Sequence, residues 1–158
     1  MKFFDWTNIT PPSSPELNIL QEEYILIAKT QKFYRDNASI IALYSNEQEH
    51  FPKKWHDYIS LVCEQDVFIM DQICKVLFPN KAFSLVRYED PNKEHYYHYT
   101  VQDDNNVIYD LQLHYIPERK EWLEKMVLVK IYKTRQDKLK LMDFHGFPWE
   151  GFHRTLYL

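Results

Sequence analysis

Glycine is almost absent from this chain of 158 residues. The first 145 residues contain none, and the two glycines are Gly146 and Gly151. Phosphate-binding loops, dinucleotide-binding turns and nucleophile elbows need glycine, because the backbone there adopts positive φ or approaches a ligand closely. The sequence therefore excludes the enzyme classes that depend on these motifs.

The sequence also has only two cysteines and no long apolar run. Cys63 and Cys74 would lie ~16 Å apart on one helix, which is too far for a disulfide. No stretch reaches the ~18–20 apolar residues of a membrane span. The first residues also lack an apolar run of signal-peptide length, so we expect a cytoplasmic protein with no membrane contact.

A surplus of positive charge is missing too. The formal net charge is −4, from 19 basic and 23 acidic residues. Nucleic-acid binding is disfavoured, because it needs a broad basic surface. The densest basic stretch, 125–140, alternates with apolar residues, which is typical of the solvated side of a hairpin.

Aromatic residues are abundant, with 12 Tyr, 10 Phe and 4 Trp. Hydrophobic residues make up 45% and charged residues 27%, which is ordinary for a folded soluble protein. The length suits one domain over residues 1–158. Large aromatic side chains that are not needed in a core are typical of protein interfaces.

The first half of the chain has helical patterns. Residues 1–14 are predicted to form an irregular arm. Ser14 and Pro15 provide a helix cap and a first helical residue, so helices are expected at about 15–35, 38–48 and 52–78. Asp66 falls within the apolar stripe of the third helix; a helix break or a rotated face near it is favoured over a buried carboxylate.

From residue 82 the apolar pattern has a period of two. It predicts strands at 82–89, 95–102, 107–115, 124–133 and 138–144, and allows a last one at 152–157. Helices followed by strands indicate an α+β fold, with the N-terminal helices packed on one face of an antiparallel meander over about 82–157.

The positions of the apolar residues, odd-numbered on both strands, predict the register of one hairpin. The apolar residues of 107–115 are odd-numbered, as are the tyrosines of 95–102, and directly opposed residues share a face. This requires a three-residue loop, Asp104 to Asn106, with an asparagine in the left-handed conformation. Val101 should then oppose Tyr109, with Tyr99 opposite Leu111 and Tyr97 opposite Leu113.

The outward face of this hairpin carries His98, Asp110 and His114. Two imidazoles and a carboxylate on one face could bind a divalent metal or act as an acid–base pair. The alternative is a solvated polar face, which the absence of a metal-binding motif favours. We therefore expect no cofactor or metal, and the sequence favours a non-enzymatic role.

The C-terminal segment combines both glycines with a cluster of aromatic residues. It is either a lid on the core or a binding surface, since Trp and Arg are enriched in interface hot spots. The expected partner-binding residues are Phe147, Trp149, Glu150, Phe152 and Arg154.

These observations favour a small protein-binding module, an inhibitor or a toxin-neutralising protein of the immunity or antitoxin type. The acidic balance would suit a basic partner such as a toxin or nuclease. One alternative is a metal-dependent or His/Asp acid–base enzyme using the 95–115 hairpin. Another is a nucleic-acid or ligand-binding sheet in which Tyr97 and Tyr99 stack on bases.

Overall fold

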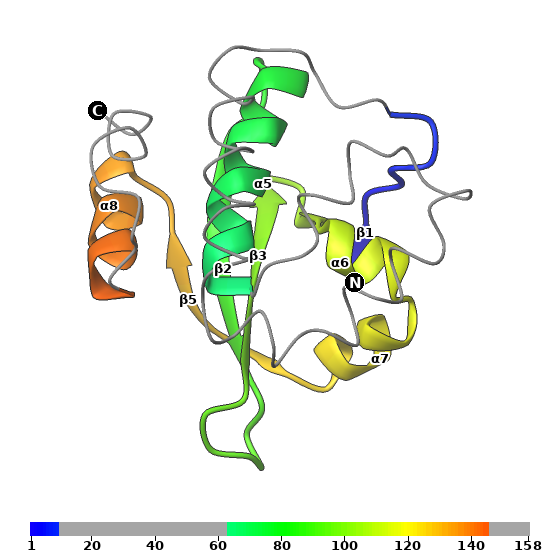
Figure 1. Cartoon of the computed structure of the whole chain (residues 1–158), viewed down its shortest axis with the longest axis vertical. Coiled ribbons are helices and arrows are strands. Elements are labelled where there is room, and N and C mark those ends of the chain that lie inside the picture. The colour runs from blue at the N-terminus through cyan, green and yellow to red at the C-terminus, as the bar shows by residue number, and fades with distance from the viewer. Residues whose placement is uncertain (10–62, 146–158) are drawn as a thin grey trace, which may run out of the picture.

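The computed structural model describes residues 1–9 and 63–145 (Figure 1). The helices expected at 15–35 and 38–48, the first part of the 52–78 helix and the strand allowed at 152–157 lie outside these residues. Within the described residues, no helix is long and apolar enough to cross a membrane.

The described part of the chain is built around a mixed sheet of five strands in the order β1-β4-β3-β2-β5. Its strands are β1 (Lys2–Phe3), β2 (Phe83–Glu89), β3 (Tyr97–Asp103), β4 (Val107–Tyr109) and β5 (Val127–Tyr132). β1 runs parallel to β4, and the other neighbours are antiparallel. Helices with a mainly antiparallel sheet agree with the predicted α+β class. The simple meander is wrong, because β5 returns to pair with β2, and the predicted irregular arm contributes β1.

Within the described residues, four helices cover the sheet: α5 (Cys63–Leu77), α6 (Leu111–Tyr115), α7 (Glu118–Glu124) and α8 (Arg135–Phe144). α5 and α8 contribute to a core with Leu85 and Tyr99, on one face of the sheet. α6 and α7 form a second core with Val86 and Tyr88, whose side chains alternate with the first set and face the other way. The expectation that helices cover one face is therefore wrong for the described residues. Figure 1 shows α5 along β2 and β3, and α8 beside β5.

Helix α5 continues through Asp66 without a break, and the Asp66 side chain is buried. The prediction of a break or a rotated face is wrong. The physical reason is that Asp66, Ile69 and Ile73 are spaced by three and four residues, so one helical face carries all three inward. Cys63 and Cys74 lie on this helix and are both free thiols, as expected.

The β3–β4 turn confirms part of the predicted register. Val101 pairs with Tyr109, and three residues separate the strands. Asn106 has a φ of 62°, the left-handed conformation expected of an asparagine in this loop. Asp103 closes the loop by accepting hydrogen bonds from the backbone N–H groups of Asn105 (2.8 Å) and Val107 (3.1 Å).

The rest of the predicted 107–115 strand is wrong, so Leu111 and Leu113 do not oppose tyrosines. The strand ends at Tyr109 because Asp110 caps helix α6. Its Oδ1 atom accepts hydrogen bonds from the backbone N–H groups of Gln112 (2.8 Å) and Leu113 (3.2 Å). Alternate leucines fit a buried strand and one side of a short helix equally well, and the cap decides between them.

The predicted strand at 138–144 is also wrong, because these residues belong to α8. Thr134 begins the helix by accepting a hydrogen bond from the backbone N–H of Asp137 (3.1 Å). The buried Lys138 ammonium donates to both carboxylate oxygens of Asp71 on α5 (3.1 Å each) and to the carbonyl of Phe83 on β2 (3.0 Å). This ion pair ties α8 to α5 and to the start of β2.

Candidate binding surface at the β5 edge

The structure brings His98 and Asp110 together. His98 Nε2 lies 2.6 Å from Asp110 Oδ2, and because a carboxylate only accepts, that nitrogen carries the hydrogen. Their side chains are 3% and 5% exposed, and the Trp122 ring packs against the imidazole. The predicted solvated face is wrong, because α6 and α7 cover it. The pair is a packed contact closed to a substrate.

His114 does not join this pair. It lies half-buried on α6, and the charges that act on it come from Asp5 and Lys120. Burial lowers the pKa of His114 below its usual value. Among the described residues, no three His, Cys, Asp or Glu side chains are placed to hold a metal ion. The alternative site of His98, Asp110 and His114 is therefore not assembled.

The two tyrosines of β3 do not form an open platform for bases. Tyr99 is buried in the core, and the Arg87 guanidinium lies 4.4 Å from the centre of the Tyr97 ring. The predicted partner-binding residues Phe147, Trp149, Glu150, Phe152 and Arg154 lie outside the described residues.

An exposed apolar strand stands at the edge of the sheet. β5 ends the strand order, so one side of its backbone has no neighbour among the described strands. Four of its side chains are 45–51% exposed: Val127, Leu128, Val129 and Ile131. Ile131 pairs with Val86 and Lys130 with Arg87, so exposed side chains of β5 lie on both faces of the sheet.

A groove of about 560 Å³ runs between β5 and α8. Val129, Lys130 and Tyr132 line it from β5; the residues from β2 and α8 are Arg87, Glu89, Lys140, Leu141 and Phe144. Phe144 is 77% exposed at the end of α8. The groove therefore joins the apolar strand edge to a set of basic side chains.

Arg87 is held in place between the groove and the core. Its Nη1 atom donates to the Tyr99 hydroxyl (2.6 Å), and its Nε atom donates to Glu89 (2.8 Å). Burial works against the charge of Arg87, but its bonds to Tyr99 and Glu89 raise its pKa. An arginine fixed by several partners loses little side-chain entropy when it meets a further acceptor.

The Arg87–Tyr99 contact continues to α8. The Tyr99 hydroxyl lies 2.9 Å from His145 Nε2. Because Arg87 donates to the hydroxyl oxygen, the hydroxyl hydrogen is left to donate to His145. Burial raises the pKa of Tyr99 and lowers the pKa of His145, so both groups stay neutral in this contact at neutral pH. Burial and the nearby Glu64 raise the pKa of Tyr97 to about 12.

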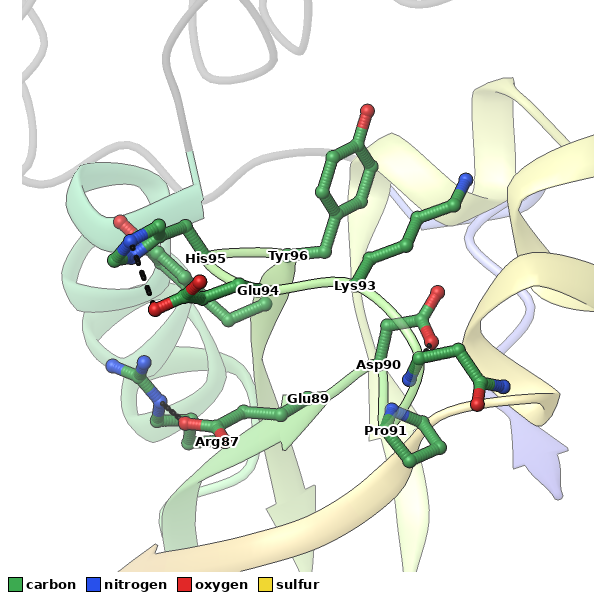
Figure 2. A pocket seen from close by; sticks show the side chains of 10 residues that line it. Arg87, Glu89, Asp90, Pro91, Lys93, Glu94, His95 and Tyr96 are labelled. Carbon is green, nitrogen blue, oxygen red and sulfur yellow. Dashed lines mark hydrogen bonds and ion pairs between the residues drawn. The ribbon is translucent and has the colours of Figure 1, made fainter.

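A second groove, of about 450 Å³, lies under the loop that joins β2 and β3 and shares Arg87 and Glu89 with the first. Figure 2 shows Glu94 and His95 on the same side of this loop as Arg87 and Glu89. His95 Nε2 lies 3.7 Å from Glu94 Oε1 on the exposed part of this loop, and His95 has a φ of 65°. The Arg87–Glu89 pair is thus the wall between two grooves.

Sequence reasoning missed this surface. The alternating basic and apolar residues of 125–140 predict the solvated side of a hairpin, whereas the structure has an edge strand followed by a helix there. The signal that could have found the helix is Thr134 followed by Asp137, an N-terminal capping pattern. Nothing local in the sequence places β5 at an edge, because that depends on pairing with β2.

Comparisons with protein-family models, with curated proteins and with solved structures give no match for this chain.

Proposed function

We propose that the chain is a protein-binding module that engages its partner at the β5 edge and the groove beside it. The observation that carries the proposal is the exposure of Val127, Leu128, Val129 and Ile131 on an edge strand. A strand edge offers backbone donors and acceptors to an extended segment of another protein, and exposed side chains supply specificity. Contiguous exposed apolar residues are a mark of interaction sites.

Features of β5 favour a dedicated partner over unspecific pairing. The register between β2 and β5 shifts near Arg87 and Tyr88, which places an extra residue, Val129, in β5. Bulges and lysines on an edge hinder pairing with arbitrary strands. Lys130 provides such a charge in the middle of the strand. A partner must therefore match both the irregular backbone and the lysine.

The proposed biological role is that of an inhibitor or toxin-neutralising protein in the cytoplasm. A surface built on β2, β5 and α8 suits such a role, because residues already held in strands and a helix lose little backbone entropy on binding. The buried His98–Asp110 pair gives no corresponding support to the acid–base alternative, since its side chains are 3% and 5% exposed.

Site-specific photocrosslinking tests this function. A photoreactive benzoyl-phenylalanine is placed at Val129, and in a separate variant at Val76 on α5. The two side chains are almost equally exposed, 45% and 46%, so Val76 is a matched control away from the edge. We expect a discrete protein adduct from position 129 in the native cells and none from position 76. Equal adducts from both positions, or none from 129, would contradict the proposal.

A further inference from the structure

We infer that the segment docking at β5 is extended, acidic and apolar, with a carboxylate seated between Lys130 and Lys140. This inference rests on the proposed function and names the chemistry of the partner. It differs from the basic partner that the net charge of the chain suggests, because the charge of this surface differs from that of the whole chain.

The groove between β5 and α8 has an excess of positive charge. Arg87, Lys130 and Lys140 line it, and its acidic lining residue is Glu89. Glu89 already accepts a hydrogen bond from Arg87 Nε at 2.8 Å. One positive and one negative charge therefore offset each other, which leaves the two lysines to attract a carboxylate.

The lysines lie where a paired strand would present a side chain. Lys130 opposes Arg87 across the β2–β5 ladder, so its side chain is on the groove face. A strand added to the side of β5 that has no neighbour among the described strands would place a residue directly opposite Lys130, at a Cβ–Cβ distance of about 5 Å. Lys140 reaches the same groove from α8.

The pattern of the partner follows from the two-residue period of a strand. Residues two positions away from the carboxylate face the same groove, where Tyr132, Leu141 and Phe144 supply apolar surface. The intervening residues face Leu128 and Ile131 on the opposite side of the sheet. The expected segment has one acidic residue flanked on both faces by apolar or β-branched residues.

A second copy of this chain is a poorer occupant of the edge. From Lys125 to Lys133 the sequence contains three lysines and no acidic residue. Pairing two β5 strands would set basic segments against each other without counter-charges, and like charges across a ladder are destabilising. An acidic segment from another protein removes this repulsion and gains ion pairs.

Random dodecapeptides displayed on phage, selected on the full chain, test the inference. We expect the enriched peptides to carry Asp or Glu between apolar residues. A synthetic consensus peptide should bind roughly fivefold or more weakly to a Lys130→Gln/Lys140→Gln variant. A peptide with Asn or Gln in place of its acidic residues should lose the same factor, and raising salt from roughly 0.05 to 0.5 M should weaken only the acidic peptide.

Two further variants separate failure of the inference from failure of the proposed function. Val129→Ser/Ile131→Ser removes apolar side chains from the edge, and Val76→Ser is the matched control. Selected peptides could bind the edge variant weakly and yet be basic, or bind equally well with and without the two lysines. Either result would contradict an acidic segment as the occupant but would still support binding at the β5 edge. Peptides that bind the edge variant as well as the control overturn both.

Sedimentation of the chain without peptide tests whether a second copy of the chain occupies the β5 edge. We expect no concentration-dependent dimer that Val129→Ser/Ile131→Ser abolishes. Observation of such a dimer would identify a second copy as the occupant and overturn the acidic segment.

Discussion

Arg87 Nη1 donates a 2.6 Å hydrogen bond to the hydroxyl of Tyr99, which joins a residue of the groove to the core of the sheet. The same hydroxyl contacts His145 at the C-terminal end of α8. One buried tyrosine therefore fixes both the arginine that separates the two grooves and the end of the helix that forms one groove wall.

Replacing Tyr99 with Phe should destabilise the fold by about 1–2 kcal/mol. The variant removes the acceptor for Arg87 and the donor to His145 while it keeps the ring. Urea unfolding measures the change. Tyr96→Phe is the control, because Tyr96 is half-exposed on the loop, and it should change stability by about 0.5 kcal/mol or less. Equal effects of the two variants would contradict the role of the Tyr99 hydroxyl.

Breaking the buried ion pair between Lys138 and Asp71 should lower the free energy of unfolding more than the Tyr99 substitution does. Lys138→Met leaves the buried Asp71 carboxylate with Lys75 at 3.3 Å, and we expect a loss of about 3 kcal/mol in the free energy of unfolding. The exposed Lys140→Met is the control, with about 0.5 kcal/mol or less. Asp71→Leu/Lys138→Met should recover most of the stability, since neither charge is then left buried. Thermal and urea unfolding of the three variants test this prediction, and a double variant no more stable than Lys138→Met would contradict it.

The left-handed conformation of Asn106 can be tested by substitution. Asn106→Gly should leave stability unchanged or raise it by up to about 1 kcal/mol, because glycine adopts positive φ without strain. Asn106→Val should cost about 1–2 kcal/mol, since a β-branched residue is strained there. The midpoints of urea unfolding rank the variants, and a valine variant as stable as the glycine variant would refute the conformation.

The histidines predict how stability depends on pH. Burial lowers the pKa of His145, and also that of His114, below the value of 6.5 in the unfolded chain. The unfolded state therefore binds more protons between the folded pKa and 6.5. The free energy of unfolding therefore has its full value, as far as these histidines are concerned, above pH 6.5. It decreases as the pH falls from 6.5 through the pKa values of the folded state. His145→Gln/His114→Gln should flatten the dependence of the unfolding free energy on pH from 5 to 7. An unchanged slope would contradict the assignment.

Some of the fold could be predicted because the signals are local. The odd-numbered apolar residues around Asn105 determine the loop length, the left-handed Asn106 and the pairing of Val101 with Tyr109. Short-range parity and turn geometry suffice for such features, since both are set by neighbouring residues.

Other parts could not be predicted from the pattern alone. Leu111 and Leu113 alternate as in a strand, yet the Asp110 cap turns them into a helix that covers the second face of the sheet. The hairpin pattern predicts that His98 and Asp110 lie close together, but the burial of this pair depends on that helix and on α7. The exposure of β5 depends on its pairing with β2, which is distant along the chain.

Hydrogen exchange of the β5 backbone tests the central claim most directly. The exchange rates of the amides from Val127 to Tyr132 are measured in the full chain alone and with the protein captured at position 129. We predict that the partner slows exchange in β5, while amides of β3 at the centre of the sheet change little. Protection confined to other segments, with β5 unchanged, would contradict an interface at this edge.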